Sequence, residues 1–413
     1  MQGLLSIAVA VYLVFYAFEG PIRYGFHLIG ADALIFLRDV LLIIPLLGIF
    51  ILQLVRRQLH PAFIIFIGII VLHGLVFIFN IGSPAVVAYC VKILMTVLVG
   101  ALCAQFLLNP GRKMLWLLLF LWAANWTGIV VDKYFVELPW VGLHASIGDV
   151  EVEVSRDWQI SGEDKRAAGL TRSSINAATI EPLLALVLIF SLRNIPLRLG
   201  VALLTIPALY WTTQKGSLLA YLITLGLIAL YPKRPIPLLR LGLFFMIILC
   251  VALPVLLSGA SMPRAEGVFS MSSFYLRIEA MWPNAWLWIH AHEIFPFGVG
   301  LGGIGGAQRL YAPTEVNAAD NIFILLYAYF GAMSFIYLGV IMAMAMKVKN
   351  DNIPSVTAAM AILVFLFGYG CVITFLEDQA ASLFFGAALA CIGHDISRNR
   401  LGLSKVNTHE STA

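Results

Sequence analysis

Basic side chains interrupt an otherwise apolar chain at a few positions, and they are the first candidates for chemistry. An arginine presents a planar fork of N–H donors that matches the oxygens of a phosphate group, and a lysine adds a point charge. Charge is costly beside or inside a long apolar run, so each such residue is a functional candidate. The residues that predict a site for an anionic ligand are Arg38, Arg166, Arg172, Lys215 and Arg277.

A glycine-rich run, residues 298–306, follows Arg277 in the chain and is suited to bring backbone N–H groups close to an anion. Its first six residues match the G-x-G-x-x-G fingerprint of dinucleotide-binding proteins. The strand that should precede this fingerprint and the βαβ unit that should surround it are missing, so we set this interpretation aside. His290 and His292 are two residues apart and would point to different faces of a helix, so they predict no metal site.

The composition of the chain is that of a membrane protein. Of its 413 residues, 61% are hydrophobic and 12% are charged, and the mean hydropathy is +0.94. A water-soluble core of this size has no room for so many apolar side chains. The apolar runs also reach the roughly 20 residues that a helix needs to cross a bilayer. These values exclude a soluble enzyme, a nucleic-acid-binding protein, a disordered chain and a disulfide scaffold.

The run lengths predict a single all-α polytopic membrane domain over residues 1–413, with about twelve transmembrane helices. We expect the first run to be a retained helix, because no basic residues precede it. Two long polar loops, 136–174 and 258–320, interrupt the spans, and the second should contain short helices. The expected spans are 3–18, 32–55, 61–79, 84–108, 114–134, 175–192, 197–213, 215–231, 239–257, 321–346, 354–376 and 379–394.

The charges of the loops orient the chain. If the N-terminus is cytoplasmic, every second loop and the tail 395–413 are cytoplasmic, and they hold 14 of the 26 basic residues but three of the 22 acidic ones. The positive-inside rule favours this orientation, with both termini in the cytoplasm and both long loops outside. The basic residues are Arg56, Arg57, Arg112, Lys113, Arg193, Arg198, Lys233, Arg234, Arg240, Lys347, Lys349, Arg398, Arg400 and Lys405.

Simpler explanations compete for some of the remaining cations. Lys215 has the position of a lysine that extends its ammonium group to the interface from a helix end. Asp39 and Lys92 are candidates for an internal ion pair, and Lys165 and Arg166 follow two acids that would make a solvated, mixed-charge surface. The outer side as a whole is nevertheless net negative, so cations converging there indicate a specific anionic ligand. A site at the membrane edge suits a lipid tail with a phosphate head.

The order of these motifs resembles the O-antigen polymerase and ligase superfamily, which contains the Wzy-type polymerases and the WaaL-type ligases. The shared features are an outer loop with arginine, a Lys-Gly-Ser turn that opens a span, and a larger loop. That loop runs from Tyr-x-Arg through Pro-Phe-Gly-x-Gly to Asp-Asn at the next span, and the resemblance covers about residues 160–345. The aspartate of Asp-Asn and the Glu-Pro pair at Glu181 look closer to exopolysaccharide polymerases of the colanic-acid or xanthan type.

This resemblance implies a GT-C-like architecture and a polysaccharide polymerase. Such an enzyme joins undecaprenyl-pyrophosphate-linked repeat units into exopolysaccharide or O-antigen at the periplasmic face of a bacterial inner membrane. Arg166 or Arg172, with Lys215 and Arg277, would bind the lipid pyrophosphate and stabilise its charge as it leaves. Asp320 stands where ligases and many polymerases carry histidine, so we expect it to be the base that takes the acceptor proton.

Glu181, inside an apolar run, and Glu279 are the alternative bases, and Asn321, Glu279 and Arg38 are further substrate-binding candidates. No cofactor and no metal are expected, because the pyrophosphate leaving group carries the activation. The partners implied are lipid-linked oligosaccharides as donor and acceptor, membrane lipid, a chain-length regulator, a flippase and export proteins, with no nucleic acid.

Two alternatives remain open. A ligase that transfers finished glycan from lipid pyrophosphate to a lipid A core would share the fold and the arginines. A transporter of lipid-linked oligosaccharides belongs to another class, and such proteins tend to have internal repeats and charges at mid-membrane. This chain has no evident repeat, and its unusual charges lie towards the outer edge.

Overall fold

The computed structural model describes residues 2–56, 61–147, 150–153, 165–261, 272–349 and 353–400. Parts of the predicted loops 136–174 and 258–320, and the tail beyond residue 400, lie outside these ranges. The helices are α1 (Gln2–Ala17), α2 (Glu19–Leu28), η1 (Asp32–Phe36), α3 (Leu37–Val55), α4 (Pro61–Asn80), α5 (Pro84–Leu102), α6 (Ala104–Leu108), α7 (Arg112–Tyr134), α8 (Ser174–Ser191), α9 (Ile195–Trp211), α10 (Lys215–Leu230), α11 (Ile236–Leu256), α12 (Ser272–Leu276), η2 (Arg277–Met281), α13 (Trp282–His292), η3 (Gly305–Leu310), η4 (Pro313–Glu315), α14 (Ile322–Phe330), α15 (Met333–Lys347), α16 (Pro354–Gly370), η5 (Phe375–Glu377) and α17 (Gln379–Arg400).

The predicted all-α fold has one small exception within the described chain. An antiparallel hairpin of β1 (His144–Ile147) and β2 (Val150–Glu153) lies in the first long loop. The remaining regular structure is helical, as lipid requires of a backbone that must pair its own N–H and C=O groups.

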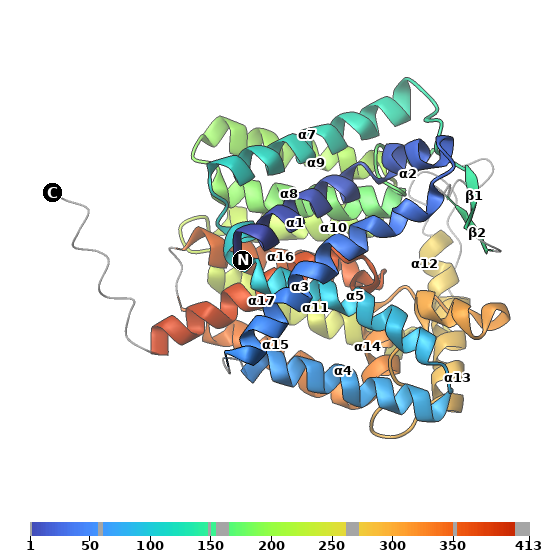
Figure 1. Cartoon of the computed structure of the whole chain (residues 1–413). Helices are drawn as coiled ribbons and strands as arrows, with labels where there is room; N and C mark the ends of the chain where they lie inside the picture. The colour runs from blue at the N-terminus through green and yellow to red at the C-terminus, as the bar shows by residue number, and fades with distance from the viewer. Residues whose placement is uncertain are drawn as a thin grey trace.

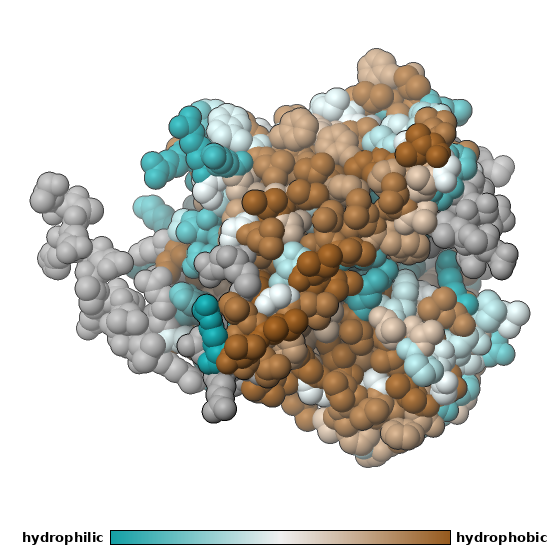
Figure 2. Space-filling view, viewed as in Figure 1, coloured by the Kyte–Doolittle hydropathy of each residue, from teal (hydrophilic) through white to brown (hydrophobic). Residues whose placement is uncertain are grey.

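The long helices lie side by side in one bundle (Figure 1). The hairpin and the short helices α12 and α13 lie together at one end, which we call the hairpin end (Figure 1). Figure 2 shows apolar residues over the middle of the bundle and hydrophilic residues gathered towards its two ends. Along α3, Ile44, Leu47 and Ile51 are more than half exposed. This distribution is typical of a helical bundle whose apolar girdle faces lipid.

Seven helical segments of the described chain are long and apolar enough to cross a membrane, and the bent pair α1–α2 is a candidate eighth. The helices α9, α10, α15 and α16 are apolar but shorter. The predicted spans all fall on helices. The structure thus supports a membrane protein with several spanning helices, and the full number of twelve stays a prediction.

Some of the predicted spans are broken. The first continues beyond 3–18 into α2, which turns by 81° from α1. The tenth, 321–346, divides into α14 and α15 at Gly331, where φ is +57°. A Cβ atom on Gly331 would lie 2.3 Å from the backbone nitrogen of Gly298. The glycine-rich loop therefore enters the break and takes the space that a continuous helix would need.

The core of the bundle is built on α16 and α17. α16 packs against α8, α10, α11 and α17, and its residues from Val356 to Phe367 are at most 3% exposed. α17 packs closely on α5 through a pair of glycines. A Cβ atom on Gly100 or on Gly386 would lie 1.9 Å from a carbonyl oxygen of the opposite helix. The two backbones are therefore in direct contact, as small residues allow between membrane helices.

This contact predicts that Gly386→Val lowers stability. The added side chain must push α17 away from α5, and overpacking of this kind costs about 1–3 kcal/mol. Melting of the purified protein in detergent, followed by size-exclusion chromatography, measures the effect. The matched control is Gly226→Val, in α10, because nothing lies within 4 Å of a Cβ atom there. Equal melting temperatures for the two variants would contradict the close contact.

Candidate functional site

The structure brings Arg277 and Asp320 together at the hairpin end. Arg277 Nη2 donates to Asp320 Oδ2 at 2.8 Å, although the residues are 43 positions apart. Arg277 Nη1 also donates to the carbonyl of Ser273 at 2.9 Å. The Arg277 side chain is 17% exposed and that of Asp320 is 30% exposed, so both can be reached from outside. Arg277, predicted to bind pyrophosphate, and Asp320, the predicted base, are therefore direct neighbours.

A π-helical turn, η2, positions Arg277. Turns of this kind often occur at functional sites. Ile278 and Trp282 are fully buried and anchor the turn, and the carbonyl of Ile278 accepts a hydrogen bond from Gly259 N at the end of α11. Glu279, one of the predicted alternative bases, is half-buried on the same turn.

Unusual backbone conformations occur at two of the predicted segments. Within the described ranges, the non-glycine residues with positive φ are Thr213 at 57°, Ala319 at 57° and Asp320 at 45°. Each such residue costs about 1–3 kcal/mol and persists only where its surroundings enforce it, which happens most often at functional sites. Thr213 precedes Lys215 by two positions. The strain thus lies at two segments that the charge pattern had singled out.

Asn321 is the residue that enforces this conformation of Asp320. Its side chain is fully buried, and its Oδ1 accepts hydrogen bonds from two backbone N–H groups in the first turn of α14. Its Nδ2 donates to the carbonyls of Cys250 and Cys371, which ties together α11 and the end of α16. Both the oxygen and the nitrogen of the Asn321 amide thus make hydrogen bonds inside the protein. The expected contact of Asn321 with substrate is therefore replaced by a positioning role.

The glycine-rich run 298–306 does not form the expected cradle for an external anion. It is buried among the helices, and most of its N–H groups donate within the protein, as when Leu301 N donates to the carbonyl of His73 at 3.1 Å. The anion that it does bind is the protein's own carboxylate, because Gly306 N donates to Glu377 Oε1 at 2.7 Å. Its glycines serve close packing.

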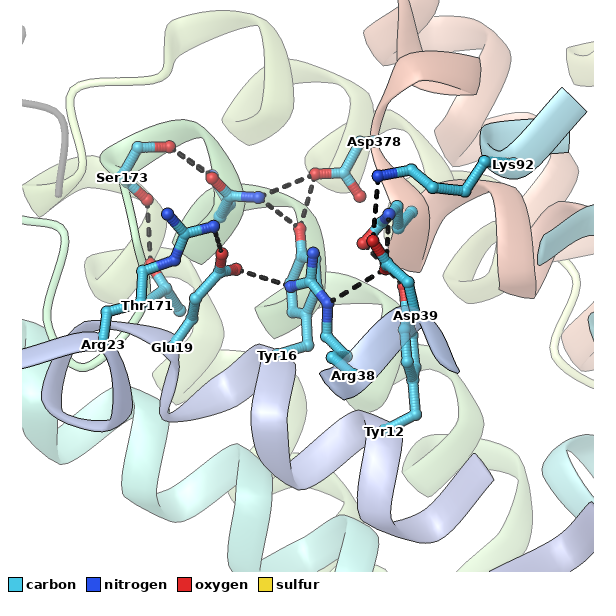
Figure 3. A network of polar contacts seen from close by, with 12 residues as sticks. Tyr12, Tyr16, Glu19, Arg23, Arg38, Asp39, Lys92, Thr171, Ser173 and Asp378 are labelled. Carbon is cyan, nitrogen blue, oxygen red and sulfur yellow. Dashed lines mark hydrogen bonds and ion pairs between the residues drawn. The ribbon is translucent and has the colours of Figure 1, made fainter. Parts of the chain in front are cut away.

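A second group of charges lies around Glu19, in the polar network of Figure 3. Arg23 forms an ion pair with Glu19 one turn away on α2, and Arg38 Nη1 lies 2.8 Å from Glu19 Oε2. Arg172 is close enough to act on Glu19 electrostatically. We call these four residues the Glu19 centre. Arg38 was predicted to bind substrate, and the structure places it here and not beside Arg277.

The network extends from Arg38 to Asp39 and Lys92 (Figure 3). Lys92 Nζ lies 2.8 Å from Asp39 Oδ2, so the predicted internal ion pair is confirmed. Gln379 Nε2 donates to the other oxygen of Asp39 at 3.2 Å, which connects the pair to the start of α17.

The loop that carries Arg166 and Arg172 is fixed by Asp132. One oxygen of this buried carboxylate accepts hydrogen bonds from two backbone N–H groups of the loop, and the other pairs with Lys165 Nζ at 3.0 Å. Arg166 is half-buried next to Lys165, and Arg172 lies at the other end of the loop by Glu19. Sequence analysis missed Asp132 and Glu19, although each is an acid at the end of an apolar run.

Glu377 lies in η5, between α16 and α17. Besides Gly306 N, it accepts a hydrogen bond from Thr374 Oγ1 at 2.8 Å. Burial raises the pKa of Glu377, the hydrogen bonds from Thr374 and Gly306 oppose that rise, and the negative charge of Asp320 adds to it. Glu377 is thus within electrostatic reach of the predicted base.

Asp378, the next residue, faces the Glu19 centre. It accepts hydrogen bonds from Tyr16 Oη and from Asn176 Nδ2, the latter at 3.0 Å. Burial raises the pKa of Asp378 to about 6, and the charge of Glu19 acts in the same direction. The two consecutive carboxylates therefore act on different charged groups, Glu377 on Asp320 and Asp378 on Glu19.

Of the remaining predicted site residues, Lys215 lies near the turn between α16 and α17 (residues 371–379), and Glu181 lies away from it. Lys215 is exposed at the start of α10, and a Cβ atom on the next residue, Gly216, would lie 2.2 Å from the side chain of Val372. Lys215 is thus held beside the 371–379 turn. Glu181 is fully buried in α8, where Oε2 accepts from Asn125 Nδ2 at 2.7 Å and Oε1 has no partner. The structure does not bring Glu181 to either centre.

The raised pKa of Asp378 predicts a pH dependence of stability. A carboxyl whose folded pKa of about 6 exceeds the ordinary 3.8 stabilises the fold below pH 3.8, and this contribution is lost as the pH rises through 6. The change is at most about 3 kcal/mol. Asp378→Asn keeps a residue that can cap α17 and is expected to flatten the melting temperature between these pH values.

The control for this experiment is Glu315→Gln, which changes an exposed carboxylate in η4. Glu377 contributes with the same sign and remains in both variants, so some pH dependence persists. An Asp378→Asn profile that parallels the unmodified protein would contradict the predicted titration of this group.

The hairpin end thus holds an Arg277–Asp320 pair and a Glu19 centre, and the two carboxylates of the turn between α16 and α17 act electrostatically on one each. In the described part of the chain, no three His, Cys, Asp or Glu side chains gather as metal ligands. Comparison with known protein families, with characterised proteins and with solved structures finds no match for this chain. What the chain does therefore has to follow from the chemistry of these residues.

Proposed function

We propose that the chain is a lipid-pyrophosphate-dependent glycosyltransferase. It would act as a polysaccharide polymerase that joins undecaprenyl-pyrophosphate-linked repeat units at the periplasmic face of a bacterial inner membrane. The observation that carries this proposal is the Arg277–Asp320 ion pair at one end of an apolar helical bundle. It places a phosphate-binding cation next to a carboxylate that can accept a proton.

In this reaction a sugar hydroxyl of the acceptor attacks the anomeric carbon of the donor. The bond from that carbon to the lipid pyrophosphate breaks, and the pyrophosphate leaves with the bonding electrons. Asp320 takes the proton of the attacking hydroxyl, and its partial exposure gives the sugar access. Arg277 stabilises the negative charge that develops on the leaving group, which is where electrostatic catalysis has its largest effect.

The state of Arg277 supports this role. Its Nε is buried and makes no hydrogen bond, while both terminal nitrogens are used within the protein. A pyrophosphate that approaches the partly exposed side chain would meet a guanidinium group already held in place by Asp320 and the carbonyl of Ser273. Lys215, which lies beside the 371–379 turn, adds a second cation for the pyrophosphate.

The apolar surface of the bundle fits a substrate with a lipid tail. Such a substrate stays in the bilayer and presents its pyrophosphate at the membrane edge, where the charged residues of the hairpin end lie. A soluble nucleotide sugar has no need of that position. The pyrophosphate carries the activation, so the proposed reaction needs no soluble cofactor.

Substitution of Arg277 tests its part in the proposal. In a host that lacks its own copy of the gene, Arg277→Ala is expected to lower polymer yield by at least about a hundredfold, as loss of a transition-state donor does. Protein level in the membrane should stay normal. Arg193→Ala is the matched control. Arg193 follows the C-terminal end of α8 and is outside the proposed site, so this variant should leave the polymer unchanged. Full polymer from Arg277→Ala would remove this residue from the site.

Asp320 requires a variant that separates catalysis from ion pairing. Asp320→Asn should abolish the polymer because the amide cannot take a proton. The exchange of both partners, Arg277→Asp with Asp320→Arg, restores opposite charges and should restore the melting temperature but not the polymer. Recovery of the polymer in the exchanged protein would show that the pair is structural.

Deletion of the gene distinguishes the reaction from its alternatives, with lipid-linked and surface glycans sized by gel and mass spectrometry. We expect single repeat units on lipid pyrophosphate in place of long polymer. Long polymer that remains on the lipid would identify a ligase. Repeat units that remain on the inner leaflet would identify a transporter and contradict the proposal.

A further inference from the structure

Two cysteine side chains from different helices meet near the hairpin end. Cys250 lies in α11, and Cys371 follows the last residue of α16. Their Sγ atoms are 3.5 Å apart, which is direct contact, although the residues are 121 positions apart in the chain. The structure describes all five cysteines, and only these two have thiols in contact with each other. We call them the cysteine pair.

The backbone of α16 holds both thiols in place. Cys250 Sγ donates a hydrogen bond to the carbonyl of Phe367 at 2.9 Å, and Cys371 Sγ lies 3.6 Å from the same carbonyl oxygen. Both sulfurs therefore converge on the last turn of α16. The sulfurs of a disulfide are about 2.05 Å apart, so the two thiols have to approach by roughly 1.5 Å to bond. That closure is shared between two side chains, each of which can rotate about its Cα–Cβ bond.

Close packing keeps α11 and α16 together around the cysteine pair. A Cβ atom on Gly368 of α16 would lie 3.4 Å from Met246 Sδ in α11. A Cβ atom on Gly242 of α11 would lie 3.7 Å from the side chain of Val364 in α16. A glycine on each helix thus lets a side chain of the other approach closely. Both cysteines are at most 5% exposed, so the folded protein holds the two thiols in contact and away from water.

The cysteine pair lies at the end of the bundle that is expected to face outwards. Asn321, beside Asp320, donates to the carbonyl of Cys371 at 3.1 Å, which places the pair next to the candidate site. The positive-inside rule predicts that this end is outside the cytoplasm. Outer compartments of bacteria are oxidising, and disulfides persist there, whereas cytoplasmic thiols stay reduced. Geometry and compartment therefore favour the same chemistry.

We propose that Cys250 and Cys371 form a disulfide bond, which ties α11 covalently to the end of α16. Each thiol gives up its proton, and one S–S bond takes the place of two S–H bonds. The two electrons and two protons pass to a disulfide-bonded oxidoreductase of the outer compartment, whose own S–S bond is reduced to two thiols. The exchange runs through a mixed disulfide and precedes the packing that buries both sulfurs. The structure describes the thiol form of the pair.

The bond acts on the residue that positions the predicted base. Asn321 Nδ2 donates to the carbonyls of these same two cysteines, at 3.2 Å to Cys250 and at 3.1 Å to Cys371. A disulfide fixes the distance between these two acceptors, so the amide that starts α14 and holds Asp320 is itself held in place. The catalytic importance of this support rests on the proposed function. The bond itself does not, because it follows from the contact of the thiols and from the compartment.

A count of free thiols tests the bond. Cells that make the full-length protein are quenched in acid, which stops thiol exchange, and the protein is then denatured in excess N-ethylmaleimide. The intact mass should show three alkylated cysteines of the five in the chain, and five when a reductant is added before alkylation. Peptide mapping should recover Cys250 cross-linked to Cys371. Five alkylated cysteines without reductant, or a cross-link between any other two, would overturn the proposal.

Cys371→Ala removes the bond, and Cys103→Ala is the matched control, because Cys103 is also buried and contacts no other sulfur. Cys371→Ala should show four alkylated cysteines and melt roughly 4 °C below Cys103→Ala, since its unfolded chain is no longer cross-linked. A host without the outer thiol oxidant should yield the unmodified protein with five thiols and a similarly lowered Tm. Equal melting temperatures for the two variants would contradict a stabilising bond.

Glycan analysis separates this inference from the proposed function. Three alkylated cysteines with unchanged glycans after gene deletion would retain the disulfide and overturn the polymerase. Five alkylated cysteines with single repeat units after gene deletion would overturn the disulfide and leave the polymerase intact. Where both proposals hold, Cys371→Ala should lower polymer yield by at least about tenfold, as displacement of a reacting group does, and Cys103→Ala should not. Equal yields would overturn the role of the bond in holding Asn321.

Discussion

Compensation of charge at the edge of an apolar bundle is the constraint on which the rest of this structure depends. Each buried charge has to find a partner, and the partners come from distant parts of the chain, as Arg277 and Asp320 do across 43 positions. Arg38 in α3 reaches Glu19 at the start of α2 in the same way. These pairs determine where the loops lie, because a loop that moved would leave a charge unpaired in a poorly solvated place. The same pairs hold Arg277 and Arg38 at the hairpin end, where the proposed phosphate ligand would lie.

Close packing allows these pairs to form. The glycines of residues 298–306 let the second long loop pass between α4, α5 and the break after α14, and Gly331 completes that passage. Asn321 then starts α14 at a defined angle and holds Asp320 in a left-handed conformation. The position of the carboxylate thus follows from backbone geometry several residues away. An aspartate on a flexible loop would lack this constraint and would have to be ordered in each cycle of the proposed reaction.

Sequence analysis located the helices from run length and one ion pair from the charges within the spans, because both properties are local to the sequence. It assigned Asp39 to Lys92, and it named both Arg277 and Asp320 as parts of one site. It could not find the Glu19 centre, because the 81° bend between α1 and α2 leaves no mark in hydropathy. It also misjudged the glycine-rich run. A run of glycines indicates that another group lies close to the backbone, but it does not say whether that group is a ligand or a helix. The fold shows that the neighbours are helices.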